Sequence, residues 1–499
     1  MTEPVVLLFL TSGLFLGWSL GANDAANVFG TAVGTGMVRF TTAAVVCSLF
    51  VILGAVISGG GAAHTLGKLG SVNALGGAFM VAFAAALTVY WMTKLGLPVS
   101  TSQAIVGAII GWNLFSGSVT DVTALTKILL TWFACPLLAG LIAVPIFKGV
   151  EYLLAHVKIH LLRLDAYTRV ALIAAGAFGA YSLGANNIAN VMGVFVPSSP
   201  FSDVSVADLF TVSSIQQLFF VGALAIAVGV FTYSKKVMLT VGGGLLPLSP
   251  VAAWVVVISH SIVLFLFASE GLEHLLANAG LPTIPLVPVS SSQAVVGAVI
   301  GIGILKGARN VQWRMLGTIG VGWVATPVIA ALLCFIALFF LQNVFRLEVY
   351  TPVPYRLSAA AVARLSDQGL AVDHLTTLKG QEFANAKAFL KASAEKITLD
   401  QRGEAALLRY AEVAPLAVDP DRLSDMDVDW FSAPQQAALK DLSGRSFEHK
   451  WQLADALAGR SEAWRLLEDT TANKRANKSI KEKLAYLSRV LAVDGVDAR

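Results

Sequence analysis

Residues 21–30 read Gly-Ala-Asn-Asp-Ala-Ala-Asn-Val-Phe-Gly, and residues 184–193 read Gly-Ala-Asn-Asn-Ile-Ala-Asn-Val-Met-Gly. A second pair of matching stretches follows in the same order, Pro-Val-Ser-Thr-Ser-Gln-Ala at 98–104 and Pro-Val-Ser-Ser-Ser-Gln-Ala at 288–294. Two long matches in one order indicate an internal duplication. The first 345 residues therefore consist of two similar halves.

The composition places this duplication in a membrane. Hydrophobic residues make up 56% of the 499 residues, charged residues only 13%, and the mean hydropathy is +0.72. Soluble domains are about 25% charged. The chain has 35 Lys or Arg and 31 Asp or Glu, of which only 13 and 9 lie in residues 1–345. These values exclude a disordered chain, and a net charge of +4 without a basic cluster in that region excludes nucleic acid as a partner.

Ten apolar stretches divide equally between the halves. They lie at 5–36, 41–60, 77–93, 98–114, 128–147, 167–190, 207–231, 237–268, 287–305 and 315–345. Because five crossings is an odd number, the second copy is expected to be inverted relative to the first, as in many transporters. Some stretches are shorter than the ~20 residues of a full span. We predict an all-α polytopic membrane protein with an inverted duplicated core, about 10–12 transmembrane segments and re-entrant half-helices.

The predicted domains follow from these stretches and from the charges. They are a first transmembrane repeat at 1–150, a cytoplasmic linker at 151–166, a second inverted repeat at 167–345, a linker at 346–356 and a soluble helical domain at 357–499. Lys148, Lys158, Arg163 and Arg169 place the first linker in the cytoplasm by the positive-inside rule. The soluble domain could serve regulation, partner docking or dimer support. A homodimer is therefore one possible assembly of the protein.

Asp24 is the one ionisable residue in its apolar stretch, beside Asn23 and Asn27. A carboxylate at membrane depth costs at least ~2.5 kcal/mol, so packing alone does not account for it. Hard oxygen ligands around one carboxylate suit Na⁺ or a proton. The alternative for the surrounding glycines is close helix packing, with Asn bonding between helices.

Three hydroxyl residues follow a proline in each half, before an apolar run. Proline ends the preceding segment, and Ser or Thr caps the next helix. A helix N-terminus with free N–H groups and hydroxyl donors is suited to a small anion. Two such ends facing each other could hold an anion without Arg or Lys. Ordinary N-capping is the alternative. These hydroxyl residues are Ser100, Thr101, Ser102, Ser290, Ser291 and Ser292.

Other chemistry is weakly represented in the sequence. There is no nucleophile–base set and no metal-ligand spacing, so we predict that the protein is not an enzyme and carries no cofactor. Residues 301–307, Gly-Ile-Gly-Ile-Leu-Lys-Gly, do not form a P-loop, which makes ATP an improbable energy source. His260 is isolated and is interpreted as a structural histidine.

The paired Gly-Ala-Asn-[Asp/Asn]-x-x-Asn and Pro-Val-Ser-[Thr/Ser]-Ser segments resemble the signatures of the inorganic phosphate transporter (PiT) family, over about residues 5–345. The resemblance implies a symporter that imports phosphate together with Na⁺ or H⁺. It assigns the phosphate to the six hydroxyl residues and Na⁺ to Asp24, Asn27 and Asn190. The expected cation-site residues are Asn23, Asp24, Asn27, Asn186, Asn187, Asn190, Gln103 and Gln293.

This chain departs from the family pattern at several positions. Asn187 stands where many members have a second Asp, Gln103 and Gln293 where many have His, and Val51 about where some have Glu. Phosphate at pH 7 can donate a hydrogen bond to a carboxylate, whereas sulfate cannot, so the loss of one carboxylate weakens the rejection of sulfate. Phosphate is the preferred substrate and sulfate the runner-up.

The resemblance leaves other classes to be distinguished by experiment. A channel or facilitator would not concentrate the anion, and a receptor would show no flux. The expected partners are the anion, the coupling ion and the lipid bilayer, and the expected location is the cell (inner) membrane as a multi-pass protein.

Overall fold

In the computed structural model the chain forms two compact units, one containing most of the residues up to Thr351 and the other the residues from Pro352 onward. The structure describes residues 3–493 except 71, 96–98, 202–203, 207–209, 245–247, 309–311, 371, 421–422, 424–425, 427–430, 469 and 471–472. Pro98 of the first hydroxyl motif therefore lies outside the described residues.

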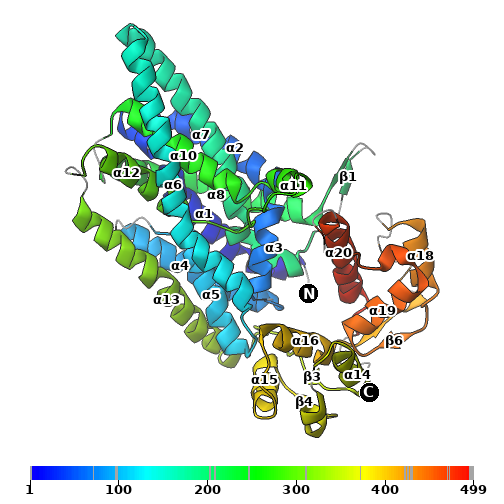
Figure 1. The fold of residues 1–499 in the computed structure, drawn as a ribbon. Helices are drawn as coiled ribbons and strands as arrows, with labels where there is room; N and C mark the ends of the chain where they lie inside the picture. Colours follow the sequence, from blue (N-terminus) through cyan, green and yellow to red (C-terminus); the bar gives the residue numbers. More distant parts are fainter. Residues whose placement is uncertain are drawn as a thin grey trace. The chain divides into compact units, whose positions relative to one another are not determined.

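The first unit is almost entirely helical (Figure 1). Its helices are α1 Glu3–Gly34, α2 Phe40–Ser58, α3 Gly60–Leu69, α4 Leu75–Lys94, α5 Thr101–Ser116, α6 Val122–His156, α7 Leu161–Met192, η1 Gly193–Ser198, α8 Ser214–Thr232, α9 Ser234–Gly244, α10 Pro250–Leu266, α11 Glu270–Asn278, α12 Ser291–Leu305 and α13 Trp313–Asn343. Two short strands, β1 Val204–Val206 and β2 Phe210–Val212, form an antiparallel pair.

Six helices in the described part of the chain are long and apolar enough to cross a membrane, namely α1, α2, α4, α6, α8 and α13. The pair α10 and α11, bent by 66°, would make a seventh span. These helices confirm the prediction of an all-α polytopic membrane protein. The other expected stretches form helices that are shorter or less apolar than these, such as α9, α12 and α7.

The two helices that follow the hydroxyl motifs are short for membrane crossings. Helix α5 has 16 residues and α12 has 15, which corresponds to about 24 Å and 22 Å. The hydrocarbon core is about 30 Å thick. The stretches 98–114 and 287–305 therefore form half-helices rather than complete spans.

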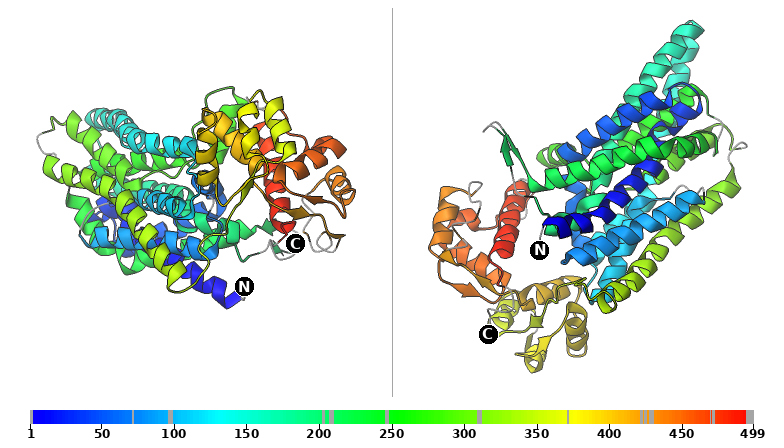
Figure 2. Two further views of the ribbon diagram at one scale, coloured as in Figure 1. Left: turned by 90° about the horizontal axis from the view of Figure 1, so that it is seen from below. Right: turned by 180° about the vertical axis from the view of Figure 1, so that it is seen from behind.

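Helices α6 and α7 form a long hairpin that extends beyond the other helices (Figures 1 and 2). Only residues 157–160 separate them, so the predicted linker at 151–166 is mostly helical. Asp165, near the end of this segment, pairs with Arg169 four positions later in α7 at 3.1 Å, a spacing that supports a helix.

The two halves exchange equivalent contacts. Helix α1 packs on α8 of the second half, and its counterpart α7 packs on α2 of the first half. In both pairs the first glycine of the Gly-Ala-Asn motif lies against a backbone carbonyl, Gly21 against Ile226 and Gly184 against Val51. A methyl group at either glycine would overlap that carbonyl. Reciprocal contacts of this kind are those of a two-fold arrangement.

The half-helices repeat the same reciprocity. Helix α12 packs on α6, where Gly297 lies against the carbonyl of Pro136, and α5 packs on α13, where Gly107 lies against the carbonyl of Pro327. Each proline is inside its helix and removes one backbone donor there. The duplicated sequence thus produces a duplicated packing, with each half-helix held by a helix of the other repeat.

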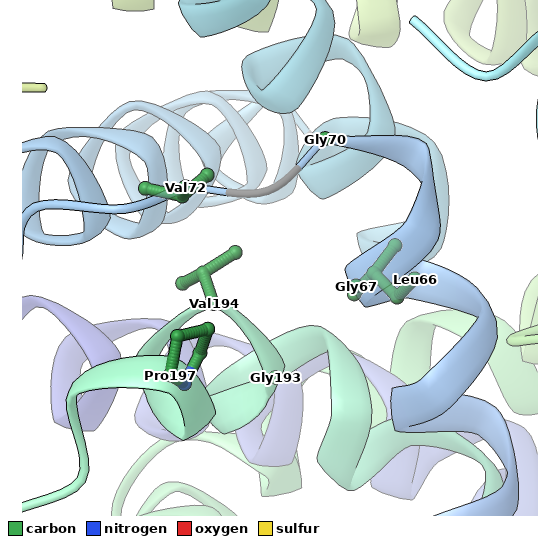
Figure 3. Close-up of a pocket in the computed structure, with 7 residues that line it drawn as sticks. All are labelled: Leu66, Gly67, Gly70, Val72, Gly193, Val194 and Pro197. Atoms are coloured by element: carbon green, nitrogen blue, oxygen red, sulfur yellow. The ribbon is translucent and has the colours of Figure 1, made fainter. Parts of the chain in front are cut away.

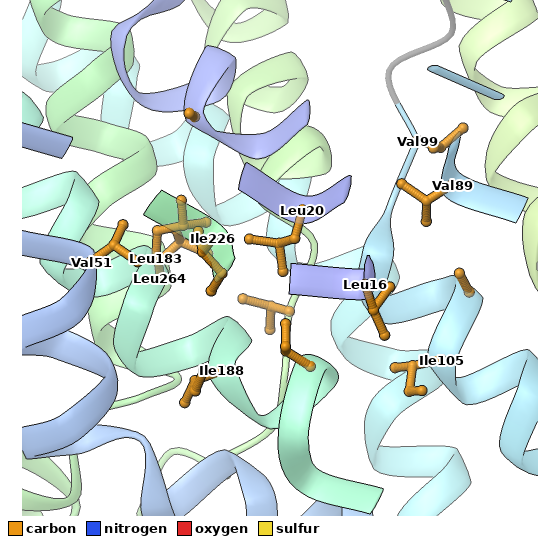
Figure 4. Close-up of a cluster of buried hydrophobic side chains, with 14 of the residues drawn as sticks. Leu16, Leu20, Val51, Val89, Val99, Ile105, Leu183, Ile188, Ile226 and Leu264 are labelled. Carbon is orange, nitrogen blue, oxygen red and sulfur yellow. The ribbon is translucent and has the colours of Figure 1, made fainter. Parts of the chain in front are cut away.

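The core of the first unit surrounds α1 (Figure 4). Leu16 and Leu20 lie between Leu183, Ile226 and Leu264 on one side and Val89, Val99 and Ile105 on the other. Val51, which stands about where some PiT members have Glu, is fully buried in this apolar cluster.

After α13 the chain returns as an extended strap at 346–351 that packs on α4 and α5. The indole N–H of Trp112 donates to the carbonyl of Val349 at 3.0 Å. Asn73 donates to the carbonyl of Thr351 at 2.7 Å and accepts from its N–H at 3.0 Å. Gly76 and Gly77 lack the side chains that would collide with the strap backbone. The first half of the predicted linker at 346–356 is therefore part of the membrane unit.

The second unit contains two similar modules. The helices are α14 Ala359–Asp367, η2 Val372–Leu378, α15 Ala386–Ala394, α16 Gln401–Ala411, α18 Ala433–Lys440, α19 Lys450–Arg460, η3 Glu462–Trp464 and α20 Lys474–Val490. The strands are β3 Tyr355–Arg356, paired with β4 Glu382–Phe383, and β5 Leu416–Ala417, paired with β6 Ser446–Phe447. Each module has its own apolar cluster.

The sequences of the modules match at one place. Leu-x-Gly-x-x-Phe occurs at 378–383 and again at 442–447, and both glycines have φ of +79°. Each motif leads through a two-residue strand into a helix, α15 capped by Asn385 and α19 by His449. The two modules therefore share one motif and the same strand-to-helix geometry after it, a similarity that the sequence analysis did not detect.

Candidate functional site

The first group of polar residues lies within α1. The Asp24 carboxylate is buried and accepts hydrogen bonds from Asn23 Nδ2 at 3.0 Å and Asn27 Nδ2 at 3.3 Å, both on Oδ1. Its Oδ2 accepts from the Thr101 hydroxyl at 3.4 Å. Among the described residues no Lys, Arg or His forms an ion pair with Asp24. A buried carboxylate without a cationic partner requires a cation or a proton for compensation.

The second group lies at the equivalent place in α7. Asn186 holds the segment before α12 on both sides, since its Nδ2 donates to the carbonyl of Val287 at 3.0 Å and its Oδ1 accepts from the N–H of Val289 at 2.8 Å. Asn190 Nδ2 donates to Asn187 Oδ1 at 3.0 Å. In the first half Asn23 contacts the corresponding segment through the Val99 carbonyl, at 3.1 Å.

The hydroxyl residues begin the two half-helices. Ser100 accepts from the N–H of Gln103 at 3.3 Å, and Ser290 accepts from the N–H of Gln293 at 3.2 Å. These are N-cap interactions, as the motif predicts. The alternative of ordinary N-capping therefore holds for the first hydroxyl of each run.

The third hydroxyl of each run connects the two halves. Ser102 donates to the carbonyl of Val289 at 3.0 Å, and Ser292 donates to the carbonyl of Val99 at 3.2 Å. Ser102 and Ser292 are equivalent residues of the two repeats, and so are Val99 and Val289. Each serine bonds to the valine of the other repeat, so the N-termini of α5 and α12 meet. Free N–H groups and partial positive charge from two helices converge there.

Ser102 also links the first half to the second Asn group. Asn190 Nδ2 donates to the Ser102 hydroxyl at 2.8 Å, and Asn187 Oδ1 lies 3.4 Å from the same hydroxyl. Thr101, its neighbour, contacts Asp24. Of the three residues predicted to hold Na⁺, Asp24 and Asn27 are in direct contact, and Asn190 belongs to the second group, on the far side of the first turn of α5.

Several polar atoms in this region have no hydrogen-bond partner within the part of the chain that the structure describes. They are Gln103 Oε1, Gln293 Oε1, Asn187 Nδ2 and Asn190 Oδ1. Each residue is at most 3% exposed. A buried polar group without a partner costs ~1–3 kcal/mol, and native proteins contain few of them. Their concentration around the half-helix tips fits a site that binds a polar solute.

His260 belongs to this region although the sequence analysis interpreted it as structural. Its Nε2 lies 2.9 Å from the hydroxyl of Ser291, and the residue is completely buried on α10. The available signal was a single histidine in an otherwise apolar helix. That signal does not reveal which residue the histidine faces.

The structure also contains a small cavity of ≈60 Å³ whose lining includes none of these polar side chains (Figure 3). It is lined by apolar side chains and glycines. Gly193, the last residue of the second Gly-Ala-Asn motif, is on its wall. The lining residues are Leu66, Gly67, Gly70, Val72, Gly193, Val194 and Pro197. With no polar side chain in its lining, the cavity is not the predicted anion site.

A polar centre buried inside an inverted bundle of membrane helices, where half-helix tips meet, defines the class of membrane transporters. The sequence comparisons agree. Residues 20–334 match the sequence profile of the phosphate transporter family, and residues 280–491 give a further match. The chain therefore belongs to the phosphate transporter family, which is a family of transporters and not of enzymes.

Individual relatives cover the membrane unit. A protein of Methanocaldococcus jannaschii assigned as a phosphate permease is 27% identical over 67% of this chain and 97% of its own length. A sulfate permease of Bacillus subtilis is 28% identical over 66% of this chain and 85% of its own. A solved structure described as a sodium-dependent phosphate transporter has the same fold, with a TM-score of 0.55 and 23% identity over 68% of this chain and 99% of that one.

Proposed function

We propose that this protein is a secondary active symporter that imports inorganic phosphate by alternating access, driven by Na⁺. The observation that carries the proposal is the meeting of two hydroxyl-bearing half-helix tips through the Ser102–Val289 and Ser292–Val99 hydrogen bonds. An oxyanion beside both tips would receive N–H and hydroxyl donors from both repeats. Membership of the phosphate transporter family supports phosphate as that anion.

The coupling ion is assigned to the Asp24 side of the site. Its carboxylate is buried with only neutral partners among the described residues, since Asn23 and Asn27 donate amide N–H groups to Oδ1 and Thr101 donates its hydroxyl to Oδ2. Carboxylate oxygens are hard ligands that suit Na⁺. A cation bound there would also offset the charge of the incoming anion, so the two solutes would favour each other's binding. A proton on Asp24 is the alternative coupling ion.

Sulfate is the second candidate substrate. Asn187 replaces a carboxylate in the second repeat, and its Nδ2, a donor, has no partner among the described residues. Sulfate can only accept hydrogen bonds. An amide donor at position 187 therefore favours the binding of sulfate, whereas a carboxylate at the same position would repel it. The likeness to the sulfate permease of B. subtilis supports the same reading.

Uptake of labelled phosphate into vesicles that contain the purified protein tests the function. Excess unlabelled sulfate should compete weakly, and strong competition would make sulfate the substrate. Replacing Na⁺ with choline should stop uptake. Uptake that is indifferent to choline but is lost when the pH gradient is dissipated would assign the proton. Uptake that never exceeds equilibrium would indicate a facilitator. We further propose that the membrane in which the protein lies is the cell (inner) membrane.

A further inference from the structure

The middle hydroxyl of each run is chemically distinct from its neighbours. Ser100 and Ser290 accept from the first turn of their own helices, and Ser102 and Ser292 donate to the opposite repeat. Thr101 and Ser291 remain. They occupy equivalent positions in the two repeats, yet their partners differ.

Thr101 faces an acceptor. Its hydroxyl lies 3.4 Å from Asp24 Oδ2, and an ionised carboxylate has no proton to give. The Thr101 proton is therefore directed toward Asp24. In this arrangement the Thr101 hydroxyl can accept a hydrogen bond from a third group but cannot donate one to it.

Ser291 faces an imidazole, which can donate. His260 Nε2 lies 2.9 Å from the Ser291 hydroxyl, and His260 Nδ1 has no partner among the residues that the structure describes. A neutral imidazole carries one N–H, on either nitrogen. A proton on Nδ1 would leave a buried N–H group without an acceptor, which native structures rarely contain. The proton is therefore assigned to Nε2, the nitrogen that has a partner.

This tautomer determines where the Ser291 proton points. If His260 Nε2–H donates to the Ser291 oxygen, the Ser291 O–H is available to donate to a third group. Helix α12 begins at Ser291, so the Ser291 hydroxyl lies next to the free N–H groups of the first turn of α12. In this arrangement His260 would orient the Ser291 hydroxyl without itself touching the ligand.

We propose that His260 is a positioning residue that orients the Ser291 hydroxyl as a donor to the transported oxyanion. The inference rests on the proposed function and deepens it. It makes the two repeats unequal: the second repeat supplies the middle hydroxyl donor to the anion, and the first repeat commits its middle hydroxyl to Asp24 and the coupling cation.

A double-mutant cycle on KM for phosphate uptake tests this role. His260→Phe and Ser291→Ala should each raise KM about tenfold with kcat changed less than about twofold, because each removes the same oriented hydrogen bond. The double variant should have the KM of a single variant. If the two effects multiply, the residues act independently and the proposal is wrong.

Two further variants separate positioning from packing. His260→Gln keeps a side-chain N–H donor and should stay within about threefold of the wild-type KM. His260→Phe combined with Ser100→Ala should show multiplied effects, since Ser100 caps the other half-helix. If His260→Phe does not reach the membrane, His260→Gln decides: a normal amount of protein with a KM as high as that of Ser291→Ala overturns the proposal.

The cycle is also distinguishable from a failure of the proposed function. Wild-type protein that accumulates neither phosphate nor sulfate would refute the transport function itself. If sulfate proves to be the transported anion, the same cycle is measured with sulfate and the same outcomes apply, because Ser291 donates to either oxyanion.

Discussion

Ser102 donates a hydrogen bond of 3.0 Å to the carbonyl oxygen of Val289, a residue 187 positions further along the chain. Val289 corresponds to Val99 in the duplicated motif, and Val99 accepts the equivalent bond from Ser292 at 3.2 Å. Because each half supplies one donor and one acceptor, the pseudo-two-fold axis passes between the two half-helix tips. A solute bound at this axis would contact both repeats at once, as alternating access around a fixed site requires.

Ser102→Ala should impair transport more than Ser292→Ala. The first change removes the hydroxyl that donates to the buried Val289 carbonyl, at a cost of ~1–3 kcal/mol, or about a tenfold loss of uptake efficiency. The second change should cost less, because the Val99 carbonyl keeps the hydrogen bond from Asn23 Nδ2. Uptake of labelled phosphate, normalised to the amount of protein in the membrane, measures the effect. Ser182→Ala is the matched control, since this serine is equally buried but, within the described part of the chain, its hydroxyl bonds to the Phe178 carbonyl of its own helix. An equal loss in the control would show that any buried serine is needed.

Asp24→Asn should nearly abolish transport. The substitution preserves the size of the side chain and removes the charge that would hold the cation, and it replaces one acceptor oxygen by an amino group that faces the donors Asn23, Asn27 or Thr101. Uptake under a Na⁺ gradient is the measurement. Wild-type turnover in this variant would show that the carboxylate is not part of the transport cycle.

Asn187→Asp is the complementary change in the second repeat. We expect transport to be retained, with a shift in the preferred cation, because a second carboxylate would stand beside Ser102 and Asn190. Comparing uptake in Na⁺ with uptake driven by a pH gradient detects the shift. Complete loss of transport would mean that the site does not accept a carboxylate on this side.

Much of this site could be predicted from the sequence because the duplication marks it twice. The matching motifs at 21–30 and 184–193 identify the two buried Asn groups, and the runs at 98–104 and 288–294 identify the caps of α5 and α12. Inverted repeats bring equivalent residues to a common axis, so the meeting of the tips follows from the order of the motifs.

Other features carry no repeated signal. His260 reaches Ser291 from a different helix, and nothing in the local sequence of α10 indicates that contact. The lengths of individual helices could not be read from hydropathy either, because an apolar stretch such as 287–305 has the composition of a crossing but includes a loop before Ser291. In the tail only Leu, Gly and Phe recur at 378–383 and 442–447, which is too short a match to stand out from sequence alone.

Gly297→Ala and Gly107→Ala should prevent normal assembly of the membrane unit. An added methyl group would overlap the backbone carbonyl of Pro136 or Pro327, and backbone of a packed helix cannot move aside cheaply. We expect little folded protein in the membrane, measured by size-exclusion chromatography in detergent. Gly320→Ala in α13 has open space around it and should be neutral or slightly stabilising. Normal yields of all three variants would show that Gly107 and Gly297 are not in close contact with the backbone of α13 and α6.

Trp112→Phe should lower the thermal stability of the membrane unit by loosening the strap after α13. The substitution keeps an aromatic ring in the same place but removes the N–H that donates to Val349, leaving a buried carbonyl unpaired at ~1–3 kcal/mol. For a unit of this size each kcal/mol corresponds to a few degrees in Tm. Trp18→Phe is the matched control, because its indole N–H donates to Thr232 at a partly exposed position where water can replace the bond. A fluorescence-detected melting curve in detergent measures both variants. The interpretation requires a clearly larger decrease for Trp112→Phe, and equal decreases would mean that the loss of indole volume, rather than the bond to the strap, determines stability.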